Sequence, residues 1–195
     1  MDFRKTEFIT SAVSPKDFIR DGRIQIAFAG KSNVGKSSVI NCLAQRKGLA
    51  RVGSAPGKTI HVNYFLTDDR VYLTDLPGYG YAKVSKAERD RWGKLMEAYF
   101  SDGTLLSLGI LIVDARHAPT ADDVQMYEWF TRTKCPMILV ANKADKLKNS
   151  ELAESSERIR RTLSLPDAQE IILFSAEKGT NRELLISAIE SALTV

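Results

Sequence analysis

Short apolar runs and longer stretches with a helical period alternate along most of this chain. A short apolar run bounded by turn residues is typical of a buried strand, and apolar residues at i, i+3, i+4 and i+7 are typical of a helix that covers a sheet. The runs predict strands at 24–29, 62–66, 71–74, 109–114, 137–141 and 171–175. The helical spacing predicts helices at 36–46, 86–100, 120–133, 151–163 and 182–193.

The order of these elements predicts an α/β fold. Strand and helix alternate except between 62–66 and 71–74, where the link Asp68 to Arg70 predicts a hairpin. We therefore expect a mostly parallel six-stranded sheet with one antiparallel strand and helices on both faces. Residues 1–22 are expected to be a lead-in packed on the domain, with an edge strand near 8–13, and residues 23–195 to form a single domain.

The segment after the first predicted strand has the pattern of a phosphate-binding loop. It reads Gly-Lys-Ser-Asn-Val-Gly-Lys-Ser, and between a strand and a helix this pattern binds nucleoside triphosphates. Its glycines let backbone N–H groups point at phosphate oxygens, and the following helix start adds its positive dipole end. Lys36 supplies charge for the outer phosphates, and the Ser37 hydroxyl can ligate Mg²⁺. The predicted phosphate-binding residues are Gly30, Lys31, Ser32, Asn33, Val34, Gly35, Lys36 and Ser37.

Two further segments predict contacts to Mg²⁺ and to a γ-phosphate. Asp75 closes a strand, where a carboxylate can hold Mg²⁺ directly or through water, and Gly78 leaves its N–H free to approach the γ-phosphate. Thr59 lies in a turn-rich stretch, and its hydroxyl can complete the Mg²⁺ shell once a γ-phosphate is present. Ser37 and Thr59 are therefore the predicted metal ligands. The predicted nucleotide contacts here are Gly57, Lys58, Thr59, Ile60, His61, Asp75, Leu76, Pro77 and Gly78.

Two late segments predict that the base is guanine. The Asp145 carboxylate can accept both N1–H and the 2-amino group of guanine in one bidentate contact. Adenine lacks this pair of donors, and such a mismatch can cost on the order of 10⁴-fold in selectivity. A backbone N–H at the end of the strand near 171–173 could meet the guanine O6. The predicted base contacts are Asn142, Lys143, Ala144, Asp145, Phe174, Ser175 and Ala176. GTP is favoured, and an ATPase is the weaker alternative.

Length and composition fit one intracellular domain. The chain has 195 residues, of which 44% are hydrophobic, so a sizeable core is expected and overall disorder is not. There is no apolar run long enough for a membrane span and no signal-peptide core, which favours a cytoplasmic protein without a membrane partner. Cys42 and Cys135 lie in apolar segments and are expected to be buried free thiols. A net charge of +4 only weakly favours acidic partners. We expect a monomer.

The sequence resembles the bacterial EngB/YihA/YsxC family, a narrower group within the translation-factor-type GTPases. The resemblance rests on the phosphate loop, on Pro56 to Thr59, on the run Asp75 to Val84 and on Asp114 to Pro119. The Pro-Gly-Tyr-Gly-Tyr-Ala-Lys-Val part of the third run is the most family-specific. The resemblance implies a Ras-like G domain of the P-loop NTPases and a Mg²⁺-dependent GTPase. It also implies a role in assembly of the large ribosomal subunit, with a requirement in normal cell division and septation.

The sequence names no catalytic residue. In Ras-like proteins a glutamine directly after Asp-x-x-Gly orients the attacking water, and Tyr79 stands at that position here. Lys36, Asn33 and Gly78 are the candidate supports for hydrolysis, which we expect to be slow without an activator. Asn33 could ligate K⁺ in place of an arginine finger, as its position suggests in several relatives, or merely stabilise a turn.

Basic residues lie in or near both segments that are expected to switch, 48–61 and 76–85. Those that cluster around the end of the second segment are Lys83, Lys86, Arg89, Arg91 and Lys94, and those in or near the first are Arg46, Lys47, Arg51 and Lys58. Such residues beside Tyr79 and Tyr81 would suit ribosomal RNA. Interspersed Glu88, Asp90 and Glu97 leave a solvated helix face as the alternative. A second functional hypothesis also stays open, namely a GTP-gated switch that binds a protein partner in cell division with little role for hydrolysis.

Overall fold

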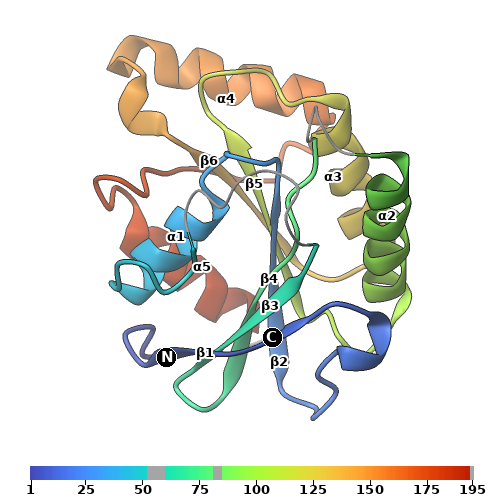
Figure 1. Ribbon diagram of the computed structural model, residues 1–195. Coiled ribbons are helices and arrows are strands. Elements are labelled where there is room, and N and C mark those ends of the chain that lie inside the picture. The colour runs from blue at the N-terminus through green and yellow to red at the C-terminus, as the bar shows by residue number, and fades with distance from the viewer. Residues whose placement is uncertain (52–59, 81–84, 194–195) are drawn as a thin grey trace.

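The computed structural model describes residues 1–51, 60–80 and 85–193. One twisted sheet forms the middle of the molecule, and helices lie on both of its faces (Figure 1). The strands are β1 (Thr6–Ala12), β2 (Ile24–Gly30), β3 (Val62–Thr67), β4 (Val71–Asp75), β5 (Leu108–Asp114), β6 (Met137–Asn142) and β7 (Ile171–Leu173). The helices are α1 (Lys36–Ala44), α2 (Lys86–Ser101), α3 (Ala121–Thr133), α4 (Asn149–Leu163) and α5 (Arg182–Leu193). Short 3-10 turns lie at Pro15–Asp17 and Ala144–Lys146.

The sheet has the order β1-β3-β4-β2-β5-β6-β7. Only β3 runs against its neighbours, because it pairs antiparallel with both β1 and β4 while the other pairs are parallel. The predicted mostly parallel sheet with one antiparallel strand is therefore confirmed, but it has seven strands instead of six. The seventh is the edge strand expected in the lead-in, which pairs along β3 from Thr6↔Thr67 to Ala12↔Val62.

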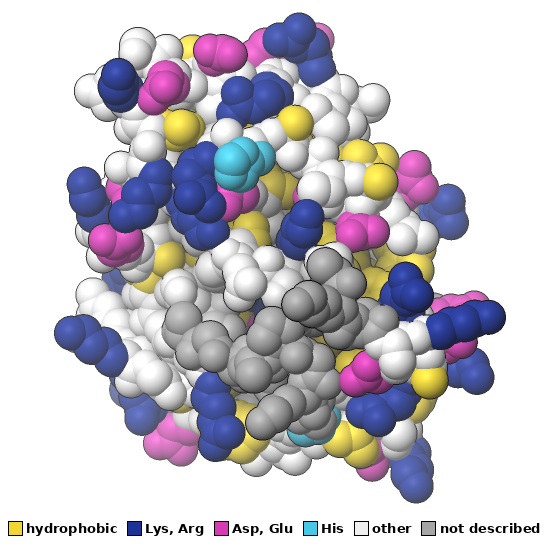
Figure 2. Space-filling view, turned by 45° about the horizontal axis from the view of Figure 1, so that its top comes forward, with side chains coloured by type: hydrophobic (Ala, Val, Ile, Leu, Met, Phe, Trp, Pro, Cys, Tyr) yellow, Lys and Arg dark blue, Asp and Glu magenta, His cyan; other side chains and the backbone are white. Residues whose placement is uncertain are grey.

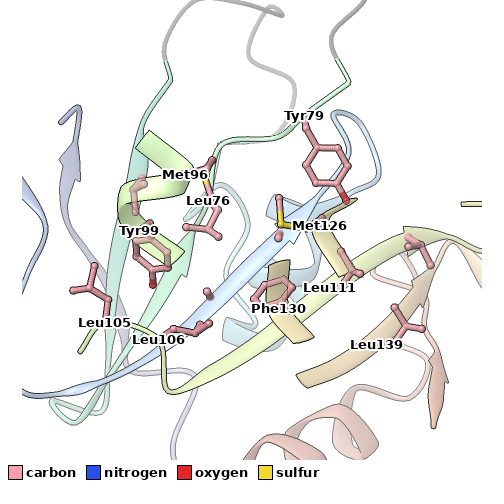
Figure 3. Close-up of a cluster of buried hydrophobic side chains, with 14 of the residues drawn as sticks. Leu76, Tyr79, Met96, Tyr99, Leu105, Leu106, Leu111, Met126, Phe130 and Leu139 are labelled. Atoms are coloured by element: carbon pink, nitrogen blue, oxygen red, sulfur yellow. The ribbon is translucent and has the colours of Figure 1, made fainter. Parts of the chain in front are cut away.

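Two hydrophobic clusters hold the helices to the sheet. On one face, α1 and α5 pack against strand residues such as Phe28 and Ile110. On the other face, α2, α3 and α4 pack against residues such as Ala27 and Leu111. Figure 3 shows part of this second cluster, which includes Tyr79. Because both faces are covered, the central strands are almost wholly apolar, as is typical of parallel sheets.

Several predicted element ends shift in the structure for local reasons. Helix α1 ends at Ala44 instead of 46, because Gln45 takes a left-handed conformation that stops the helix. Helix α4 starts two residues before the predicted Glu151, whose carboxylate accepts the Lys148 N–H at 2.6 Å and caps the helix start. The cysteines Cys42 and Cys135 are free but only half-buried, which corrects the expectation of buried thiols.

No helix in the described part of the chain is both long and apolar enough to cross a membrane.

Candidate nucleotide-binding site

The polar segments singled out by the sequence meet at the carboxyl edge of the sheet. Strands β2, β4, β5, β6 and β7 run in the same direction, so the residues that follow them emerge at one edge. In open α/β sheets, ligands bind at this edge.

The phosphate loop is shaped by close packing against its neighbours. Gly35 has φ +97°, and a Cβ built there would lie 2.4 Å from Asn142 Nδ2, so a side chain would meet both strain and a clash. Val34 is buried, and its carbonyl oxygen accepts a hydrogen bond from Asn142 Nδ2 at 2.9 Å. The loop is therefore fixed in place by Asn142 at the end of β6, which is 108 residues away from Val34 in sequence.

Lys36 and Asp75 form a buried ion pair beside the first turn of α1. Their side chains are only 10% and 8% exposed, and Lys36 Nζ donates to Asp75 Oδ1. The sequence predicted both near the outer phosphates and Mg²⁺, and the structure brings them into contact. Removing either partner would leave an uncompensated buried charge, which is costly in proteins.

Ser37 follows Lys36 in the first turn of α1 and is half-buried. Its hydroxyl makes no hydrogen bond to any other residue that the structure describes. Thr59, the second predicted metal ligand, lies outside the described residues, as do Gly57 and Lys58. Ile60 and His61 lead into β3, and burial lowers the pKa of His61.

The segment after β4 lies against the phosphate loop. The Leu76 N–H donates to Phe28 O at 3.0 Å, and the Ser32 N–H donates to Tyr79 O at 2.8 Å. Gly78 lies between these contacts, and a Cβ built there would be 3.4 Å from Ser32 Cα. The backbone at Gly78 therefore lies within van der Waals reach of the phosphate loop.

The Tyr79 side chain is part of the second hydrophobic cluster (Figure 3). Its side chain is buried, and its hydroxyl donates to Asp123 Oδ1 at 2.7 Å. Burial, followed by the neighbouring Asp123 carboxylate, raises the pKa of Tyr79 well above its usual value. In this conformation Tyr79 cannot orient a water at the phosphates, which agrees with the absence of a predicted catalytic side chain here.

Asn142 and Lys143 tie three segments together at the end of β6. Besides its bond to Val34, Asn142 accepts the Ala176 N–H at 3.1 Å through Oδ1. Lys143 has φ +67°, and its Nζ donates to Asn33 O at 2.8 Å and to Asp114 Oδ2 at 3.0 Å. Asn33 is left-handed as well, with φ +64°, which supports its role in a turn.

Asp145 presents a buried carboxylate at this edge. Its side chain is 3% exposed, and Oδ1 accepts the Ser175 hydroxyl at 2.7 Å. That hydrogen bond, with the ion pair to Lys146 at 3.1 Å, lowers the pKa of Asp145. Oδ2 faces the Lys146 ammonium but accepts no well-aligned hydrogen bond from the described residues. Asp145 Oδ2 is thus ion-paired with Lys146 but lacks a well-aligned hydrogen-bond donor among the described residues.

The predicted backbone donors after β7 are already used within the protein. The Phe174 N–H donates to Ala141 O at 2.8 Å, and the Ser175 N–H donates to Thr180 O at 3.3 Å. The Ala176 N–H donates to Asn142. If one of these N–H groups also contacted a base, it would therefore have to share its hydrogen between two acceptors.

The sequence analysis did not predict that two carboxylates, those of Asp114 and Asp123, belong to this site. Burial alone would raise the pKa of Asp114, but hydrogen bonds from Arg116 and Lys143 hold it well below its usual range. Asp114 ends β5, whose other residues are all apolar or glycine, and this is a signal that could have marked it. Asp123 is buried and caps α3, and the Thr120-x-x-Asp123 spacing of a capping box was its signal.

Basic side chains lie around this face and are mixed with acidic ones (Figure 2). On α2, Lys86, Arg89, Arg91 and Lys94 are exposed, and the acidic residues Asp90 and Glu97 are exposed among them. Arg46, Lys47 and Arg51 are exposed after α1, while Lys83 and Tyr81 lie outside the described residues.

Comparison with known proteins identifies the family to which the chain is similar. A family model described as a 50S ribosome-binding GTPase matches residues 25–143, and the elongation factor Tu GTP-binding domain matches residues 94–194. The chain is 46% identical to a probable GTP-binding protein EngB of Geobacillus thermodenitrificans over 194 residues, 100% of each chain. It is 48% identical over 186 residues to a probable EngB of Clostridium beijerinckii, covering 95% of this chain and 94% of the relative.

Solved structures show the same fold. The crystal structure of a probable EngB matches with a TM-score of 0.73 and 26% identity, covering 87% of this chain and 98% of that one. The structure of Era in complex with MgGDPNP and part of 16S ribosomal RNA matches with a TM-score of 0.66 and 22% identity, covering 87% of this chain and 57% of Era, and supports the fold alone. The predicted P-loop GTPase fold is confirmed. With near-complete coverage at 46–48% identity, the chain belongs to the EngB family of GTP-binding proteins.

Proposed function

We propose that this protein is a Mg²⁺-dependent GTPase that reads guanine through Asp145 and acts as a switch in assembly of the large ribosomal subunit. The observation that carries the guanine assignment is the buried Asp145 carboxylate, whose Oδ1 accepts the Ser175 hydroxyl and whose Oδ2 lacks a well-aligned hydrogen-bond donor among the described residues. A donor pair such as N1–H and the 2-amino group of guanine matches this acceptor, whereas adenine would leave it unpaired.

The proposed nucleotide site has two sides. The base side consists of Asn142 to Asp145 and Phe174 to Ala176. The γ-phosphate side consists of Lys36 and the segment Asp75 to Gly80. Backbone N–H groups of the phosphate loop and the N-terminus of α1 would hold the phosphates between the two sides. Titration of the protein with GTP, GDP and ATP tests this site, and equal affinity for ATP would contradict it.

The residues present fit a bound Mg²⁺. Mg²⁺ prefers hard oxygen ligands, and the uncommitted Ser37 hydroxyl and the Asp75 carboxylate supply them at the phosphate loop. We propose Ser37 and Thr59 as direct ligands, with Asp75 as a direct or water-mediated partner. When bound, the ion would neutralise charge on the phosphates during transfer. Removal of Mg²⁺ with a chelator should weaken GTP binding, as titration in the presence and absence of EDTA would show.

Hydrolysis is proposed to be slow because Tyr79, at the position of the water-orienting glutamine of Ras-like proteins, is buried and bonded to Asp123. Lys36, the loop backbone and the Gly78 N–H would stabilise charge on the transferred phosphoryl group. We keep K⁺ at Asn33 as a proposal for further charge stabilisation. Faster turnover in KCl than in NaCl at equal ionic strength would support it, and equal rates would remove it.

The ribosomal role is supported by the family description and by the exposed basic residues of α2. Co-sedimentation of the purified protein with ribosomal subunits tests it, using GDP, a non-hydrolysable GTP analogue or no nucleotide. Binding to the large subunit only with the analogue would support a GTP-gated assembly factor. Absence of binding in every state would favour the alternative of a protein-binding switch in cell division and septation. Lys86→Ala with Arg89→Ala should weaken subunit binding while GTP affinity is kept.

We further propose that the protein works as a cytoplasmic monomer. In this proposal residues 23–195 form the single GTP-binding domain and residues 1–22 are its lead-in. The two free cysteines support a reducing compartment. Light scattering across a range of protein concentrations would test the monomer.

A further inference from the structure

The backbone from Pro77 to Gly80 is anchored on both sides of Gly78. Before it, Pro77 O accepts the indole N–H of Trp92 at 3.0 Å. After it, Tyr79 O accepts the Ser32 N–H at 2.8 Å. Gly80 has φ +73°, and a Cβ there would lie 2.9 Å from Lys31 Cε. The peptide that carries the Gly78 N–H is thus fixed by α2 on one side and by the phosphate loop on the other.

The side chain of Tyr79 adds a third anchor. Its hydroxyl donates to Asp123 Oδ1 at 2.7 Å, in a buried contact. Asp123 Oδ2 accepts from Thr120 twice, from the N–H at 2.7 Å and from the hydroxyl at 2.8 Å. The carboxylate therefore sits in the N-terminal capping box of α3, where a negative charge is stabilised. Tyr79 is bonded to a rigid, fully partnered group instead of to a mobile side chain.

The anchors meet in one aromatic group. Trp92 packs edge-on against Tyr79, with ring centroids 6.3 Å apart, and stacks on Trp129 of α3 at 5.9 Å. The chain has two tryptophans, and both belong to this aromatic group, so the tryptophan fluorescence of the protein comes from it. Any displacement of the Pro77–Gly80 backbone would change the surroundings of the Trp92 indole, because its N–H bonds directly to that backbone.

We propose that Tyr79 is a positioning residue that discriminates GTP from GDP through the backbone. By its bond to Asp123 it holds the Gly78 N–H in place for the γ-phosphate, although its own side chain never reaches the nucleotide. This inference rests on the proposed function, in which the γ-phosphate lies at Gly78. Tyr79 stands at the position that carries glutamine in Ras-like proteins. Here the residue at that position holds the Gly78 backbone in place instead of orienting the attacking water.

Tyr79→Phe tests the proposal, because it removes the hydroxyl and keeps the ring packing. A hydrogen bond to a charged group is a strong one, and its loss here should lower affinity for a non-hydrolysable GTP analogue about tenfold. Hydrolysis at saturating GTP should slow by about the same factor. Affinity for GDP should stay within about twofold of wild type, since GDP makes no contact at Gly78. If the Tyr79 hydroxyl had a merely structural role, its loss would change the affinities for the GTP analogue and for GDP equally.

Tyr127→Phe is the matched control. Tyr127 is a half-buried tyrosine on α3 whose hydroxyl makes no hydrogen bond to a described residue, so neither affinity should change. Trp92→Phe is a second variant, which removes the donor to Pro77 O. It should also lower the affinity for the GTP analogue relative to the affinity for GDP. In wild type the tryptophan emission should differ between analogue and GDP, and Tyr79→Phe should reduce that difference.

Two results would overturn the inference alone. Either equal losses for GDP and the analogue, or no loss for either, in Tyr79→Phe would show that the hydroxyl does not act on the γ-phosphate side. Failure of the wild-type protein to bind GTP and GDP would instead overturn the proposed function, and this inference with it.

Discussion

The base side and the γ-phosphate side of the proposed site are built in different ways. On the base side, buried polar side chains bridge separate segments, as Asn142 does between Val34 and Ala176. On the γ-phosphate side, backbone groups make most of the contacts, and the one buried charge pair is Lys36 with Asp75 within the described residues. The first arrangement offers a preformed acceptor for one base. The second offers a backbone whose position depends on its contacts with α2 and α3.

The largest effect that would sharpen this comparison is expected from Asp145→Asn. The amide replaces an acceptor with a donor, so the preference for GTP over xanthosine triphosphate should reverse. The selectivity change is expected to be on the order of 10⁴-fold. Competition binding with the two nucleotides measures it. Asp167→Asn, at an exposed position after α4, is the control and should leave selectivity unchanged. Unaltered selectivity in Asp145→Asn would break the base assignment.

Lys36→Met probes the γ-phosphate side. It leaves the Asp75 carboxylate buried without its partner, which should lower the free energy of unfolding by about 3 kcal/mol. Urea denaturation measures this loss. Adding Asp75→Asn should recover part of it, since the unpaired charge is then removed. If the double variant is no more stable than Lys36→Met, the ion pair is not what holds this side together.

Gly35→Ala should damage both sides together, because Gly35 lies where they touch. A Cβ 2.4 Å from Asn142 Nδ2 would push that amide away from Val34, and the positive φ adds strain. We expect a loss of about 1–3 kcal/mol in stability and weaker binding of GDP and GTP alike. Gly93→Ala in α2 is the matched control. Its Cβ meets nothing within 4 Å, so it should stabilise the protein by up to about 1 kcal/mol.

The smallest effect concerns pH and involves two carboxylates at the base side, Asp145 itself and Asp114, which accepts a hydrogen bond from Lys143. The folded-state pKa values of Asp114 and Asp145 are lowered, so each group contributes stability above its unfolded pKa near 3.8. That contribution falls away as the pH drops below this value toward the folded pKa. Asp114→Asn should therefore flatten the acid limb of a stability curve, measured by thermal melts between about pH 5 and 2. The effect is modest because the partner Arg116 is 40% exposed and screened by solvent.

Much of the fold could be predicted because its signals are local. The run from Ile24 to Ala44 carries a strand, a glycine-containing loop and a helix start in one continuous pattern. The carboxyl-edge location of Asp75, Asn142 and Asp145 followed from the parallel order of the strands. These predictions needed no knowledge of which side chains touch.

The remaining features depend on contacts between distant residues. The Tyr79–Asp123 bond joins residues 44 apart, and periodicity alone cannot show which buried hydroxyl meets which carboxylate. The end of α1 shifted because a single residue, Gln45, adopts left-handed backbone. The pairing of β1 with β3 made a seventh strand from a lead-in whose partner no local pattern identifies.

The same β1–β3 pairing has a consequence for the order of events during synthesis. Strand β1 is made before its partner, because Ala12 pairs with Val62 and Thr6 with Thr67. At about 5–20 residues per second, roughly 3–10 s separate the two strands. During that interval the apolar side chains of Phe8, Ile9 and Val13, which remain partly exposed even in the finished fold, have no sheet to join. Among the described strands, β1 is therefore the one that remains without a partner for longest while the chain grows.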